Sequence, residues 1–93
     1  MKVYIIGKVT GLEYEHCRDL FAKREKELED GGHQVVNPIN VVPEGTPWIP
    51  AMKVCIKELI DCEGYSILPN ALSSRGALLE RLIAMHLKLI EIQ

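Results

Sequence analysis

The sequence predicts an α/β fold, a three-layer sandwich built on a four-stranded parallel sheet with strand order 2-1-3-4. Short runs rich in β-branched residues alternate along the chain with segments of helical periodicity. The connections are short, and parallel neighbours require crossovers, which are right-handed. The chain has 93 residues, 47% of them hydrophobic and 26% charged, so we expect a single globular domain over residues 1–93.

The first strand is expected at Lys2 to Ile6, an apolar run that ends at Gly7. Its composition is typical of a central strand that is buried on both faces. From Leu12 the apolar spacing becomes helical, and the helix is expected to stop at Gly31-Gly32. Its apolar stripe consists of Cys17, Leu20, Phe21 and Leu28.

The middle of the chain predicts a strand, a loop and a second helix. His33 to Val36 is the strand candidate. Asn37 to Pro50 is expected to be an irregular loop, because its prolines resist strand pairing and helix continuation. The helix is expected from about Pro50 to Cys62. Its core-facing residues are Met52, Cys55, Ile56, Leu59 and Ile60.

The last third predicts strand, helix and strand. Gly64 to Pro69 forms the third strand, and Ser73-Ser74 can cap the third helix. The apolar positions of that helix include Ala77, Leu78, Leu82, Met85 and Leu87. Leu89 to Ile92 is the last strand. The complete order is that of a Rossmann-like or flavodoxin-like sheet.

The net charge and the cysteine spacing exclude several classes of binding partner and metal site. Eleven basic and thirteen acidic side chains give a net charge of -2, which argues against broad binding to a nucleic acid polymer or an anionic membrane. Cys17, Cys55 and Cys62 form no CxxC pair, and no His lies at a zinc-ligand interval from two of them. We expect free thiols, no metal, no cofactor, no membrane-spanning segment and a cytoplasmic location.

Ligands of open α/β sheets bind beyond the carboxyl ends of the strands. This rule places Gly7 to Gly11, Asn37 to Pro50 and Pro69 to Gly76 along one rim. The first and third of these segments lead into helix N-termini, which favour anions such as phosphate, and Lys8 can add positive charge. The alternative for Gly7 to Gly11 is a tight strand-to-helix turn without a binding role.

Glu80 stands out because it interrupts an apolar helical stretch. It follows Gly76 by four residues, so both lie on one helix face, and the missing side chain at Gly76 is expected to leave open space beside the carboxylate. The alternative is that Glu80 pairs with Arg81, Arg75 or His86 and only solubilises the helix.

Four segments together resemble the nucleoside 2-deoxyribosyltransferase-like superfamily, and most closely its small uncharacterised bacterial and phage members. The resemblance spans nearly the whole chain, and its most specific part is the last of the four. These segments are Val3 to Gly11, Val36-Asn37-Pro38, Leu59-Ile60-Asp61-Cys62, and Ser74-Arg75-Gly76-Ala77-Leu78-Leu79-Glu80.

The resemblance implies an N-glycosidic hydrolase or (deoxy)ribosyltransferase that acts on a nucleoside or a nucleoside 5'-phosphate with retention. Glu80 would attack the anomeric carbon, and Tyr4 would hold Glu80 or the sugar through its hydroxyl. The alternative for Tyr4 is an aromatic side chain that simply packs at the strand end. The residues expected to bind substrate are Gly7, Lys8, Thr10, Gly11, Asn37, Ser74, Arg75 and Gly76.

The chain departs from the family pattern in three places. Cys55 stands where an Asp that assists protonation of the leaving group is usual, Lys8 replaces a frequent Pro, and Gln93 precedes the C-terminal segment of fuller transferases. A thiol is a poor substitute for a carboxylic acid. A nucleotide-binding or sensing module without turnover is therefore the second hypothesis. A third is a partner-binding protein with Trp48 as its interface anchor.

A homodimer or higher homo-oligomer is expected for two reasons. The family commonly builds its sites across subunit contacts. The last helix is also apolar on more sides than one sheet face can cover, through Leu78, Leu79, Leu82, Ile83, Met85 and Leu87. The alternative is a monomer in which that helix is fully buried.

Overall fold

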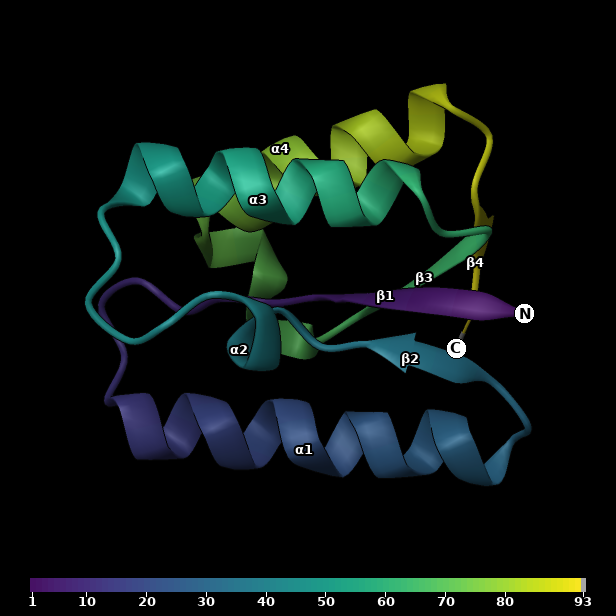
Figure 1. Cartoon of the computed structure of the whole chain (residues 1–93), viewed down its shortest axis with the longest axis horizontal. Helices are drawn as coiled ribbons and strands as arrows, with labels where there is room; N and C mark the ends of the chain where they lie inside the picture. The colour runs from purple at the N-terminus through teal and green to yellow at the C-terminus, as the bar shows by residue number, and fades with distance from the viewer. Residues whose placement is uncertain (93) are drawn as a thin grey trace.

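A computed structural model describes residues 1–92 and confirms the fold class, with four parallel strands in the order β2-β1-β3-β4. In Figure 1, α3 and α4 cover one face of the sheet and α1 covers the other. The elements are β1 (Lys2–Ile6), α1 (Tyr14–Asp30), β2 (Gln34–Val36), α2 (Pro38–Val41), α3 (Trp48–Ile60), β3 (Gly64–Ile67), the 3₁₀ helix η1 (Pro69–Ser73), α4 (Arg75–His86) and β4 (Ile90–Glu91).

The central strand β1 separates two hydrophobic cores. Side chains alternate between the faces of a strand, so Val3 and Ile5 pack in the α1 layer, whereas Tyr4 and Ile6 pack beneath α3 and α4. All four side chains are fully buried, which confirms the expectation of a strand covered on both faces. The alternation therefore directs the Tyr4 side chain toward α4.

Helix α1 packs closely where β1 ends. Its predicted stripe is confirmed, since Cys17, Phe21 and Leu28 are buried. A Cβ placed on Gly7 would lie 2.8 Å from Cζ of Phe21 and 2.6 Å from Cδ1 of Leu68. Gly7 therefore allows the strand end to approach both core side chains, which any larger residue would displace.

The expected loop at Asn37 to Pro50 contains two helical segments that the prolines were taken to exclude. Asn37 caps α2, because its Oδ1 accepts a hydrogen bond from Ile39 N at 3.0 Å, and Pro38 occupies the first helical turn. Helix α3 already begins at Trp48, with Pro50 in its first turn. Proline is tolerated in the first turn because the amide hydrogen it lacks has no partner within the helix there.

Two predicted apolar stripes are partly wrong. Leu59 is buried on α3 as expected, but Ile60 is 51% exposed. On α4, Ala77 is buried, whereas Leu78, Leu82 and Met85 are exposed, as is Leu87 directly after the helix. The residues that α4 buries are Gly76, Ala77, Glu80 and Ala84. Small side chains let α4 lie close to the sheet, and the leucines turn outward.

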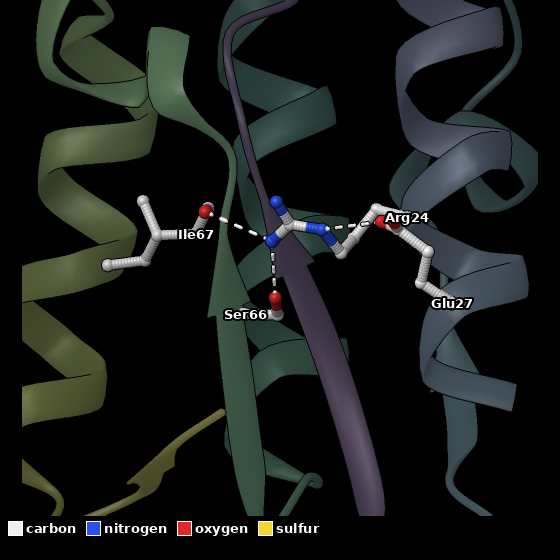
Figure 2. Close-up of polar contacts among 4 residues, drawn as sticks. All are labelled: Arg24, Glu27, Ser66 and Ile67. Carbon is white, nitrogen blue, oxygen red and sulfur yellow. Dashed lines mark hydrogen bonds and ion pairs between the residues drawn. The ribbon is translucent and has the colours of Figure 1, made fainter. Parts of the chain in front are cut away.

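Arg24 of α1 satisfies the open edge of β3. The carbonyl oxygens of Glu63 and Tyr65 accept hydrogen bonds from β4, but the carbonyl of Ile67 lies beyond the end of that pairing. Nη1 of Arg24 donates to this carbonyl at 3.2 Å and to Oγ of the buried Ser66 at 2.7 Å (Figure 2). The contact ties α1 to β3 across the sheet.

Within residues 1–92, no helix combines the length and the apolar character that crossing a membrane requires.

Candidate active site

The centre of the site is a buried pair of side chains that lie 76 positions apart in the sequence. Tyr4 Oη donates a hydrogen bond of 2.5 Å to Oε2 of Glu80. Tyr4 is fully buried and Glu80 is 5% exposed. None of the ion pairs among residues 1–92 involves Glu80, so the alternative that it pairs with a neighbouring Arg or His is not realised.

Burial changes the acidity of both groups. It raises the pKa of Glu80 from its ordinary value of 4.5 to about 7, while the hydrogen bond from Tyr4 acts in the opposite direction. Burial, together with the nearby charge of Glu80, raises the pKa of Tyr4 far above its usual range. The phenol therefore keeps its proton and serves as a donor, and Glu80 changes its charge close to neutral pH.

A cavity of about 280 Å³ lies against this pair. It is bordered by the end of β1, the loop that follows β1, the segment from α2 to α3, and the N-terminal halves of α3 and α4. In Figure 1, the loops that border it gather at the left of the sheet. The predicted site residues that line it are Tyr4, Gly7, Thr10, Ser74, Gly76 and Glu80. Sequence reasoning therefore identified the floor and one side of the cavity.

A second cavity, about 740 Å³ in volume, adjoins the first and shares Thr10, Trp48, Ser74 and Gly76 with it. Its two charged lining residues among residues 1–92 are Lys8 and Arg75, both cationic. The Arg75 guanidinium lies 4.2 Å from the centre of the Trp48 ring, a cation–π contact, and Lys8 Nζ lies 3.4 Å from Oγ of Ser73. These two cations and the first turn of α4 make the second cavity favourable for an anion.

Gly76 lines the same cavity as Glu80, so there is open space beside both residues. Gly76 also lets α3 and α4 approach. A Cβ there would lie 2.9 Å from Sδ of Met52 and 3.4 Å from Nε1 of Trp48, two side chains of α3 that border the same cavity.

Two predicted binding residues lie outside both cavities. Gly11 is exposed and has a φ of +86°, which indicates the turn between β1 and α1. Asn37 is buried, caps α2, and donates through Nδ2 to Oε1 of Glu25 at 2.9 Å. The structure thus gives both residues local structural contacts.

Several residues of the cavity were not predicted. They are Tyr14 on α1, Trp48 and Met52 on α3, and Glu44 in the connection between α2 and α3. Glu44 is the one with a usable signal, because it is an acidic residue between Pro43 and Gly45 in a segment already placed at the rim. Cys55 also lines the cavity, and burial raises the pKa of its thiol.

The lining groups suit acid–base or nucleophilic chemistry at a small polar ligand. A carboxylate, a phenol and a thiol meet in one partly enclosed space, and two cations stand at its outer side. Among residues 1–92, no three His, Cys, Asp or Glu side chains are grouped so that they could hold a metal ion.

Comparison with known proteins gives a family and no named relative. None of the curated proteins matches the chain. The family model described as "Domain of unknown function (DUF4406)" matches residues 1–92, and the chain therefore belongs to that family.

Proposed function

We propose that the protein cleaves or transfers the N-glycosidic bond of a nucleoside or nucleoside 5'-phosphate, with retention, through Glu80 as the nucleophile. The observation that carries this proposal is the Tyr4–Glu80 hydrogen bond at the wall of a cavity sized for a small ligand. The resemblance to the nucleoside 2-deoxyribosyltransferase-like superfamily supports the same chemistry. The assignment to that superfamily stays a prediction.

The geometry supports different roles for the two carboxylate oxygens of Glu80. Tyr4 binds Oε2, which orients the carboxyl group and stabilises its charged form, while Oε1 is left to attack C1' of the sugar. The C1'–N bond breaks as the C1'–O bond forms, and the leaving base takes a proton from a general acid or from water. Water, or a second base, then attacks C1' and releases the sugar from Glu80, so that two inversions give net retention.

The paired cavities support a nucleotide as the substrate. The cavity of about 280 Å³ beside Tyr4 and Glu80 (the inner cavity) offers apolar walls from α2 and α3 to a base and sugar. The second cavity (the outer cavity) adjoins it and offers Lys8, Arg75 and Ser74 to a phosphate. A nucleoside 5'-monophosphate has its apolar and anionic parts in this order.

Free base released from a panel of nucleosides and nucleoside 5'-monophosphates, in ribose and deoxyribose form, tests this proposal. Chromatography should detect the base with at least one monophosphate. The release should be faster than from the matching nucleoside, because the phosphate adds binding energy to the outer cavity. No base from any member of the panel would contradict the enzymatic proposal.

Cys55 favours one second candidate, a nucleotide-binding module that has lost its acid. A half-buried thiol with a raised pKa donates protons less readily than the carboxyl group expected at this position. Such a module would be stabilised by ligand, by about 2.7 kcal/mol at ~100 Kd, without releasing base. Thermal unfolding with each monophosphate, combined with Cys55→Asp, separates the two candidates. Base release that appears only in Cys55→Asp supports the impaired module.

Homo-oligomerisation in the cytoplasm stays a prediction. The apolar residues Leu78, Leu82 and Met85 lie on one side of α4 and are between 43% and 52% exposed. A second copy that covers this side would bury them by two-fold symmetry. Sedimentation should then show a dimer that Leu82→Glu converts to a monomer. A monomeric wild-type protein would contradict the prediction.

A further inference from the structure

Glu44 is the second carboxyl group of the cavity. Among the residues of the described chain that line it, Glu44 and Glu80 are the two that carry a carboxyl group. They reach the cavity from opposite parts of the fold, Glu80 from α4 and Glu44 from the connection between α2 and α3. Their surroundings also differ, because Glu80 is buried and bonded to Tyr4, whereas Glu44 is exposed.

The backbone holds Glu44 at this position. Thr46 N donates to the carbonyl of Pro43 at 3.2 Å, and its Oγ1 donates to the same oxygen at 2.7 Å. Gly45 has a φ of +87°, so Glu44 and Gly45 are the central residues of a tight turn. Five consecutive residues around this turn line the cavity, namely Val42, Pro43, Glu44, Gly45 and Thr46. The turn is therefore a wall of the site.

We propose that Glu44 is the acid–base residue of the N-glycosidic reaction, and this inference rests on the function proposed above. Retaining glycoside cleavage uses two carboxyl groups, one as nucleophile and one to move protons. Cys55, at the position where the resemblance expects the acid, supplies a thiol. Glu44 lines the same cavity from a different element and carries a carboxyl group.

Glu44 gives up a proton in the first step of the reaction and regains one in the second. In the first, the Glu44 carboxyl group gives its proton to a nitrogen of the leaving base, the C1'–N bond breaks, and Oε1 of Glu80 bonds to C1'. In the second, the Glu44 carboxylate takes a proton from water, the water oxygen bonds to C1', and the C1'–Oε1 bond breaks. Glu44 is then protonated again, and Glu80 is again a carboxylate.

The role of Glu44 as the acid is tested with a substrate whose base needs no proton in order to leave. The probes are deoxyguanosine 5'-monophosphate and its N7-methyl derivative, whose cationic base departs neutral. In Glu44→Gln, guanine release from the first should fall by roughly 100-fold or more, the range of general acid catalysis. The N7-methyl derivative should still give a rapid first turnover of one base per chain. Later turnovers should be slow, and azide, which needs no base to activate it, should restore them.

The controls separate this inference from the proposed function. Glu29→Gln makes the same charge change at an exposed position of α1 that lines neither cavity, and it should behave as wild type. Glu80→Gln should lose the first turnover with both probes. Glu44→Gln that matches wild type on both probes, or that loses the first turnover equally on both, overturns the role of Glu44 alone. A wild-type protein that releases base from neither probe overturns the proposed function together with this inference.

Discussion

Replacing Glu80 with Gln is expected to abolish base release and, at the same time, to stabilise the fold above neutral pH. The nucleophile is lost, because an amide cannot form the glycosyl-enzyme, so the rate should fall by at least ~10³-fold. Stability should rise because the variant no longer buries a charge at the wall of the cavity.

The stability effect depends on pH with a definite sign. The carboxyl group of Glu80 loses its proton near pH 4.5 in the unfolded chain and near pH 7 in the folded one. Between these values the folded protein holds the extra proton, so its stability falls as the pH rises through this window. At about 1.36 kcal/mol per pKa unit, the advantage of Glu80→Gln over wild type should grow by roughly 3 kcal/mol from pH 4 to pH 8.

Urea unfolding of both proteins at several pH values measures this difference. Glu29→Gln, at an exposed position, is the matched control and should follow wild type. An advantage of Glu80→Gln that is the same at pH 4 and pH 8 would mean that Glu80 is not forced to ionise in a buried position. The assignment of Glu80 as a buried carboxylate that is ionised in the folded protein would then be wrong.

Removing the Tyr4 hydroxyl is the second large change. Tyr4→Phe deletes the donor that stabilises the charged form of Glu80, a hydrogen bond worth roughly 1.5–3 kcal/mol when one partner is ionised. The pKa of Glu80 should therefore rise further, by about 1–2 units. At pH 7 about half of Glu80 is ionised in wild type, so this rise in pKa should lower the ionised fraction, and with it kcat/KM, by roughly 5- to 50-fold.

The profile of kcat/KM against pH measures this shift. In wild type the rate should increase with pH through about 7, as Glu80 loses its proton. In Tyr4→Phe the rise should move to higher pH, so that part of the lost activity returns at pH 9. Tyr65→Phe is the matched control, because Tyr65 pairs with Tyr4 in the sheet but lines neither cavity. A profile unchanged by Tyr4→Phe would exclude the proposed positioning of Glu80.

The sheet and its order were predictable because periodicity and connection length leave few parallel arrangements. Glu80 was predictable because a lone acid in an apolar stretch of helix is unusual. The contact between Tyr4 and Glu80 was expected from the resemblance alone, because alternation along β1 places Tyr4 on one face of the sheet and does not name its partner. The fold and the floor of the site were therefore accessible without coordinates.

The other features of α4 and of the cavity depend on packing between elements, which the local sequence pattern does not predict. The outward turn of Leu78 and Leu82 results from small residues that let α4 approach the sheet, and small residues carry little periodic signal. The close approach of Met52 to Gly76 depends on how α3 packs against α4, since Met52 comes from another helix. Glu44 reaches the cavity only because a tight turn folds its segment over the site, a long-range outcome of loop geometry.

Trapping the glycosyl-enzyme tests the nucleophilic role of Glu80 most directly. The probe is a nucleoside 5'-monophosphate whose sugar is an arabinose with fluorine at C2'. Its sugar should form the C1'–O bond to Glu80, and the resulting glycosyl-enzyme should hydrolyse slowly, because fluorine opposes positive charge on the sugar. Mass spectrometry of the treated protein should show one sugar phosphate per chain, on the peptide that contains Glu80, and none in Glu80→Gln. Base release without an adduct, or an adduct on another residue, would contradict the account.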